Sequence, residues 1–256
     1  MGEIGRRLVW ESILGVQIPM GGINPRTVVY SWMVMAAIFI ISRLIVRRLS
    51  EVPGRAQVVL EMFVGAFDSL VSESLELPTA RDNRKYLALI ASLFIFLIIS
   101  NMLGFLPGTE LLYLVVHGHD GEGGLLWFFS EVEEPTADIN TTLGLGIMGF
   151  CIAIYSGIRA KGVLKWFLEL FEPLPWYIPL FFPLNVVGEL AKIVSISFRL
   201  FGNIIGGSII LLIVSNLIYY FLLPVPLDFF FIFFVGAVQA FVFTILTLTY
   251  ITVAIK

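Results

Sequence analysis

The sequence predicts an all-α integral membrane protein with about five membrane-crossing helices plus one amphipathic surface helix. Of its 256 residues, 58% are hydrophobic and only 14% are charged, and the mean hydropathy is +0.95. A soluble domain usually carries about 25% charged residues. Several apolar runs reach the length of about 20 residues that a helix needs to cross a bilayer. We therefore expect a single membrane domain, residues 1–256, in place of one or two soluble domains.

The first half of the chain contains two predicted spans separated by an amphipathic segment. The first span covers residues 28–46 and is followed by the helix-breaking pair Pro53-Gly54. Across residues 56–77, apolar side chains recur at helical spacing with polar ones opposite, which predicts a helix lying on the membrane surface. The second span covers residues 86–105 and follows a basic cluster.

Three further spans are predicted in the second half. The third covers residues 139–158 and follows an acidic loop, residues 108–138, that contains no Lys or Arg. The fourth, residues 184–223, is nearly twice as long as one crossing requires, so we expect it to tilt or kink. The fifth covers residues 227–255 and forms a long tilted hairpin with the fourth.

The basic residues predict how the chain is oriented. They cluster at residues 43–55, 81–85 and 159–165, and short cytoplasmic loops are enriched in Lys and Arg. We therefore expect the N-terminus and the acidic loop outside and the C-terminus in the cytoplasm. The first 27 residues lack the pattern of a cleaved signal peptide. A bacterial plasma membrane is the expected location, with an organellar inner membrane as the alternative.

Arg199 is the residue that most directly indicates a function, because it lies deep within the fourth span. An arginine at the centre of a membrane helix costs about 2.5–3.5 kcal/mol on insertion scales. At about 100° per residue, polar and small residues share its side of the helix within about 80°. These residues are Asn185, Gly188, Lys192, Ser195, Asn203 and Gly206. Their stripe must face protein or water instead of lipid.

A carboxylate partner for Arg199 is missing from the obvious places in the chain. Glu189 lies about three turns away, and Asp228 is close to the start of the last span. One interpretation is a structural ion pair that joins two helices, and the preferred one is a carboxylate supplied by another chain. Small residues that let a neighbouring helix approach closely follow at Gly202, Gly206 and Gly207.

Few other polar residues lie deep in the predicted spans. For Gln239 in the last span, a helix–helix hydrogen bond and a functional role are both open. Asn101 and Asp138 could line a hydrated path or cap a helix. Motifs for nucleotide binding, zinc proteases and serine hydrolases are absent, and His117 and His119 lie in a loop without converging ligands. We therefore expect no cofactor, no metal and no bound nucleotide, and the net charge of −3 argues against nucleic-acid binding.

Four motifs of this sequence resemble those of the a subunit of F-type ATP synthase. The most specific is Ser195-Ile-Ser-Phe-Arg199-Leu-Phe-Gly-Asn203. Supporting motifs lie at residues 100–108, 135–142 and 236–241, and the four occur in the order of the family. The resemblance extends from residue 28 to the end of the chain.

The resemblance implies a stator subunit that couples transmembrane ion flow to ATP synthesis and is not an enzyme on its own. Two half-channels would lead ions to and from the rotating ring of c subunits, and Arg199 would face the ring carboxylate. The first span and the amphipathic helix would contact the b subunit of the peripheral stalk. The implied ion path comprises Lys192, Ser195, Asn203, Ser208, Gln239, Asn101 and Asp138. The implied ring contacts are Gly202, Gly206 and Gly207.

Ser208 and Ile232 depart from the pattern of the family. Many members carry a Glu or His at the first of these positions and a complementary His or Glu at the second, which form a proton relay. Without that pair the identity of the coupling ion is left open, and we favour protons over sodium. A free-standing ion channel or secondary transporter, with Arg199 as an anion or substrate site, is the alternative function.

Overall fold

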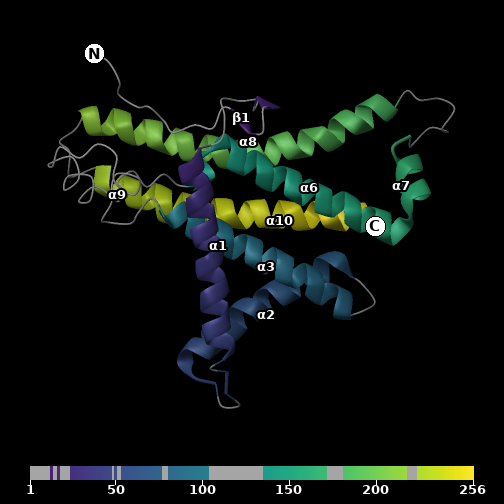
Figure 1. The fold of residues 1–256 in the computed structure, drawn as a ribbon, viewed down its shortest axis with the longest axis horizontal. Helices are drawn as coiled ribbons and strands as arrows, with labels where there is room; N and C mark the ends of the chain where they lie inside the picture. The colour runs from purple at the N-terminus through teal and green to yellow at the C-terminus, as the bar shows by residue number, and fades with distance from the viewer. Residues whose placement is uncertain are drawn as a thin grey trace. The chain divides into compact units, whose positions relative to one another are not determined.

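The computed structural model describes most of the chain, and its helices are labelled in Figure 1. The described residues are 12–13, 16–17, 24–47, 49–50, 53–76, 80–103, 135–171, 181–217 and 224–256. The α-helices are α1 (Pro25–Val46), α2 (Arg55–Leu75), α3 (Ala80–Met102), α6 (Ile139–Lys161), α7 (Val163–Glu169), α8 (Phe182–Leu217), α9 (Pro224–Phe229) and α10 (Gly236–Ile255). A 3-10 turn, Pro135–Ala137, precedes α6, and a π-helix, Phe230–Val235, precedes α10. The strands β1 (Ser12–Ile13) and β2 (Val16–Gln17) pair as a short antiparallel hairpin.

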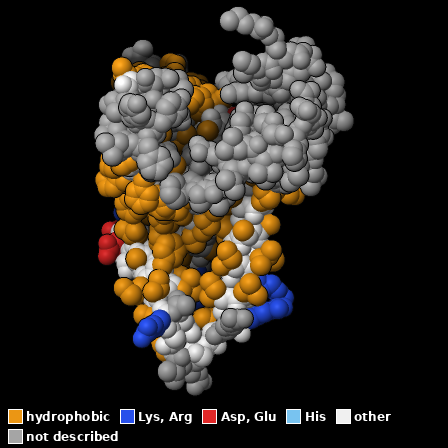
Figure 2. All heavy atoms as spheres, turned by 90° about the vertical axis from the view of Figure 1, so that its left-hand side faces the viewer, with side chains coloured by type: hydrophobic (Ala, Val, Ile, Leu, Met, Phe, Trp, Pro, Cys, Tyr) orange, Lys and Arg blue, Asp and Glu red, His pale blue; other side chains and the backbone are white. Residues whose placement is uncertain are grey.

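Five of the described helical segments are long and apolar enough to cross a membrane. They are Thr27–Val46, Arg84–Met102, Ile139–Lys161, Phe182–Leu211 and Phe230–Ile255. Each overlaps one of the five spans expected from the sequence, so the prediction of an all-α, multi-pass membrane protein is confirmed. On the face drawn in Figure 2, hydrophobic side chains cover most of the described surface, as lipid contact requires.

The last predicted span is not one uniform helix. The expected segment 227–255 begins within α9, continues through the π-helix and ends as α10. Helix α8 begins two residues before the predicted start of the fourth span, at Phe182. Residues 218–223, the predicted end of that span, lie outside the described residues.

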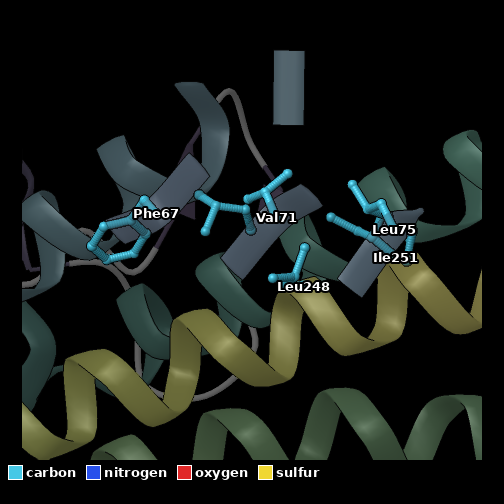
Figure 3. Packing of buried hydrophobic residues seen from close by; sticks show 7 residues of the cluster. Phe67, Val71, Leu75, Leu248 and Ile251 are labelled. Carbon is cyan, nitrogen blue, oxygen red and sulfur yellow. The ribbon is translucent and has the colours of Figure 1, made fainter. Parts of the chain in front are cut away.

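Helix α2 agrees with the predicted amphipathic helix in its bounds, but only half of its apolar face is free. Val59 and Met62, near its start, are 67% and 70% exposed. Toward its end, Phe67, Val71 and Leu75 are buried in a core with side chains of α3, α6 and α10 (Figure 3). The second half of α2 therefore packs on protein, and the expectation that the helix lies on the membrane surface stays a prediction.

The described chain falls into two compact units. The first comprises Met1–Ile40, Phe96–Thr141 and Phe201–Val238, and the second comprises Ile41–Ile95, Thr142–Leu200 and Gln239–Lys256. The boundaries fall inside helices such as α3 and α8 and do not coincide with linkers. The single membrane domain expected from the sequence stays a prediction.

Glycines of α6 let its neighbours come close within the second unit, where α6 lies beside α10 (Figure 1). A Cβ at Gly149 would lie 3.3 Å from the Thr247 side chain, and one at Gly157 would lie 2.9 Å from the Ala254 carbonyl oxygen. Small residues at helix contacts are the usual device of membrane bundles, since lipid tails compete for every larger apolar surface. This packing joins α6 closely to α10 within the second unit.

Candidate functional site

Arg199 lies near the middle of α8 and on an exposed side of it. Helix α8 runs Phe182–Leu217, so about 25 Å of helix separate Arg199 from either end. In the second unit Ser195, Phe198 and Arg199 are exposed, and we call these three residues the arginine face. The neighbouring residues Ile196 and Leu200 turn inward and are 3% and 0% exposed. The Arg199 side chain is therefore exposed on the described surface of the chain, near the middle of α8.

No carboxylate among the described residues pairs with Arg199. The ion pairs that the structure describes join Lys161 to Glu169, Lys192 to Glu189 and Lys256 to Glu76. Glu189 is thus engaged by its own neighbour, three residues along the helix. A guanidinium that faces lipid in the middle of a membrane helix is strongly unfavourable. We therefore expect the arginine face to contact protein or water that lies outside the described part of the chain.

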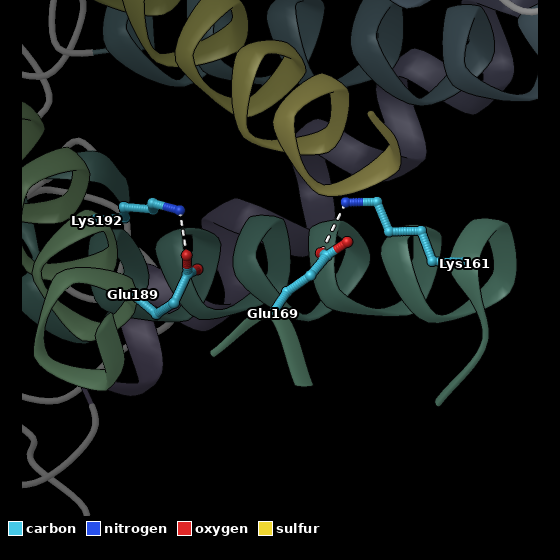
Figure 4. Close-up of polar contacts among 4 residues, drawn as sticks. All are labelled: Lys161, Glu169, Glu189 and Lys192. Atoms are coloured by element: carbon cyan, nitrogen blue, oxygen red, sulfur yellow. Dashed lines mark hydrogen bonds and ion pairs between the residues drawn. The ribbon is translucent and has the colours of Figure 1, made fainter. Parts of the chain in front are cut away.

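A polar cavity of about 440 Å³ lies in the second unit, among α6, α7, α8 and α10. Its lining includes Glu169, Asn185, Glu189, Lys192 and Tyr250. Figure 4 shows its two ion pairs, in which Lys192 bonds Glu189, and the Lys161 ammonium lies 2.8 Å from the Glu169 carboxylate. Lys192 is seven residues before Arg199, about 10 Å along the helix axis.

The other cavity contacts fix the Lys192 ammonium from a second side. Its Nζ atom lies 5.6 Å from the centroid of the Tyr250 ring, within range of a cation–π interaction. The Asn185 amide donates to the Leu170 carbonyl at 2.9 Å and so ties α8 to the end of α7. Lys192 and Asn185 were singled out in the sequence, whereas Glu169 and Tyr250 were missed. Their positions depend on how α7 and α10 fold back, for which the sequence carries no local signal.

In the first unit, the glycines that follow Arg199 on α8 differ in their surroundings. Gly202 is exposed, and added Cβ atoms at Gly202 and Gly206 would meet nothing within 4 Å. Gly207 is buried, and its Cβ would lie 3.1 Å from the Phe231 ring. Its small size is therefore used within the chain itself.

Three polar candidates lie in different environments. Asn203 is exposed on α8, one turn after Arg199. Ser208 is exposed, and its hydroxyl donates to the Ile204 carbonyl at 3.0 Å, within its own helix. Gln239 is 4% exposed, on the buried side of α10.

Asn101 and Asp138 hold elements of the first unit together. The Asn101 amide donates to the Gly236 carbonyl at 2.9 Å and accepts from the Thr136 hydroxyl at 2.7 Å. Asp138 accepts from the Asn140 backbone N–H at 2.9 Å, at the start of α6, and from the Thr27 hydroxyl at 3.0 Å. Of the two roles left open by the sequence, these contacts support capping and bracing over lining a path.

The described residues contain no group of three or more His, Cys, Asp or Glu side chains placed to hold a metal ion. His117, His119 and the remainder of the acidic loop up to residue 134 lie outside the described residues. The expectations made for that loop stay predictions.

The fold and the site together define a multi-pass helical membrane protein with an exposed arginine near the middle of a long apolar helix. Residues 28–252 match the family described as ATP synthase A chain. The chain therefore belongs to this family, the membrane-embedded a subunits of the Fo sector, which are parts of the ATP synthase complex and not enzymes by themselves. A subunit of that complex, in place of a free-standing channel or transporter, is thus the class of protein that the findings support.

Curated relatives agree over most of their length. The chain is 37% identical over 228 residues to the "ATP synthase subunit a, sodium ion specific" of Propionigenium modestum. The matched region covers 88% of this chain and 72% of the relative. It is 36% identical to the ATP synthase subunit a of Aliarcobacter butzleri, over 86% of this chain and 84% of the relative. For the subunit a of Moorella thermoacetica, identity is 36% over 88% of each chain. Family membership implies partners within Fo such as the c ring and the b subunit.

Proposed function

We propose that this chain is the stator that gives ions access to the ring of c subunits, with Arg199 facing the ring carboxylates. One observation carries the proposal: a mid-helix arginine is exposed and has no carboxylate partner among the described residues. A carboxylate on the ring would supply the missing partner. Because an arginine side chain carries a positive charge, it attracts a ring carboxylate only after that group has released its ion. Arg199 thereby separates loading from unloading.

The polar cavity is our candidate for the half-channel on the cytoplasmic side. Lys161, whose ion pair borders it, follows the third span in a cluster predicted to be cytoplasmic. Its carboxylates and ammonium groups are paired, so the cavity has a polar wall without a strong net charge, and it ends about two turns before Arg199. For the opposite half-channel we propose Asn203 and Ser208, both in the first unit.

The exposed apolar side of α2 is our candidate for the contact with the b subunit of the peripheral stalk. Val59 and Met62 lie there, whereas the other half of the same helix is fixed in the protein core. One half anchors the helix, and the other half is left free for a partner or lipid. We place the chain in a bacterial plasma membrane, with its N-terminus outside and its C-terminus in the cytoplasm, as the basic clusters predict.

Disulfide crosslinking to the ring tests the proposed contact. In a complex in which Cys151 is replaced by serine, a cysteine introduced at Gly202 should crosslink to cysteines on the outer helix of a c subunit. A cysteine at Gly207, five residues along the same helix, should not, since that position is buried against Phe231. Equal crosslinking at both positions, or none at Gly202, would contradict the proposed ring-facing side.

Sodium dependence tests the coupling ion. We propose protons, because the described polar groups after Arg199, such as Asn203 and Ser208, are neutral amides and hydroxyls along which water-borne protons can pass. Sodium is the second candidate, favoured by the sodium-specific name of one relative. ATP hydrolysis by the purified complex should be unchanged when sodium is added to sodium-free buffer, and ATP should acidify vesicles in its absence. Stimulation by sodium, with sodium uptake into vesicles, would reverse the assignment.

A further inference from the structure

We propose that Gly146 of α6, through its contact with Ser197 of α8, is a positioning residue that sets how far Arg199 projects from the chain. A Cβ built at Gly146 would overlap the Ser197 Oγ atom, and it would lie 3.3 Å from an Ile196 methyl carbon and 3.4 Å from the Ile193 carbonyl oxygen. All these residues belong to the second unit. The inference rests on the proposed role of Arg199 at the ring.

Ser197 itself indicates that the contact is governed by space and not by hydrogen bonding. It is 1% exposed, and its hydroxyl has no hydrogen-bond partner among the described residues. A buried hydroxyl without a partner is unfavourable, so nothing in its bonding explains a serine here. The position requires a small side chain, because Ser197 occupies the space that a side chain at Gly146 would fill.

Helical geometry connects this contact to the arginine. Ser197 and Arg199 are two residues apart, about 200° around the helix axis. The side of α8 that rests on Gly146 is therefore opposite the arginine face. Any atom added at Gly146 pushes α8 outward in the direction in which Arg199 already points. Since packed helices transmit such strain instead of absorbing it, the displacement reaches the guanidinium.

Other glycines of α6 provide the matched control. Gly144 is exposed, and a Cβ there would meet nothing within 4 Å. It lies on the same helix, two residues away, and a substitution there changes helix propensity by the same amount. The two positions differ in their contact with α8 and not in their residue type.

The experiment compares Gly146→Leu and Gly144→Leu in the assembled complex. We expect the Gly146 variant to lose roughly a hundredfold of its ATP-driven ion pumping, as for a functional group misplaced by about 1 Å. Its passive ion leak per assembled complex should rise, which reduced assembly alone would not cause. Gly144→Leu should pump and assemble like the parent. Equal pumping by both variants would overturn the proposal.

A milder pair keeps the test valid if Gly146→Leu fails to assemble. Gly146→Ala adds only the methyl group that would meet Ser197, and Ser197→Ala, which removes the unpartnered hydroxyl, should be neutral alone and restore pumping in the double variant. Failure of Ser197→Ala to rescue the loss, or no loss in Gly146→Ala, would overturn the inference. Arg199→Ala is run alongside. If that variant pumps normally the proposed function fails, whereas if it is inactive while both Gly146 variants match their controls, only the positioning role fails.

Discussion

Replacing Arg199 with alanine should abolish ATP-driven ion pumping while leaving the complex assembled. We expect a loss of about a hundredfold to a thousandfold, the range seen when a preorganised electrostatic group is removed from a site. The physical reason is that, under the proposed function, the ring carboxylate then meets no fixed cation between the two half-channels. Pumping is measured as quenching of a pH-sensitive dye in vesicles, or as sodium uptake if sodium is the coupling ion.

The same variant should also leak. An ion that crosses a membrane carrying 100 mV releases about 2.3 kcal/mol, so any path between the half-channels that avoids rotation is downhill. Without the charge of Arg199, an ion can stay on the ring carboxylate as it passes α8. Passive ion flux through membranes that contain the complex should therefore rise as pumping falls.

Assembly is not expected to suffer, because Arg199 is unfavourable to insertion. Removing an arginine from the middle of a membrane helix favours insertion by about 2.5–3.5 kcal/mol. Arg159→Ala is the matched control, since Arg159 is also exposed but lies at the end of α6, 3.3 Å from the Tyr155 hydroxyl. That variant should pump like the parent. Normal pumping by an assembled Arg199→Ala complex would refute the proposed role of Arg199.

Hydropathy was sufficient to predict the five spans, because the membrane requires long apolar helices whatever their neighbours are. The stripe around Arg199 could also be predicted, since it depends only on the helical period. None of its members that the structure describes is buried. What sequence alone could not reveal was which small residues serve the chain itself. Gly202 and Gly207 look equivalent in sequence, and only the position of Phe231 distinguishes them.

Contacts between distant segments were equally inaccessible to sequence analysis. The π-helix Phe230–Val235 consists entirely of apolar residues and carries no marker of its irregular backbone. Asn101 looked like a candidate for an ion path because it is polar and deep in a span. Its partners, Thr136 and Gly236, are 35 and 135 residues away. Its role as a brace follows only from the tertiary structure.

Replacing Asn101 with leucine should therefore destabilise the chain strongly. Asn101 and Thr136 are 2% and 0% exposed, so leucine leaves the Thr136 hydroxyl and the Gly236 carbonyl without their partner. An orphaned buried polar group costs about 1–3 kcal/mol, although bonds between membrane helices average nearer 0.6 kcal/mol. We expect a total loss of about 1–3 kcal/mol, measured as a lower temperature at which the chain leaves the detergent-purified complex.

Asn101→Asp separates the two bonds of the brace. The carboxylate keeps the acceptor for Thr136, but it replaces the N–H donor by an oxygen that faces the Gly236 carbonyl. Because two acceptors repel, this nearly isosteric change should destabilise the chain although it preserves side-chain volume. Ser92→Ala on α3 is the control, since the Ser92 hydroxyl is exposed and bonds only its own helix, to the Leu89 carbonyl at 2.9 Å. If Asn101→Asp and Ser92→Ala shift the dissociation temperature equally, Asn101 does not hold α3 to the start of α10. The expectation that Asn101 lines the ion path is then favoured again.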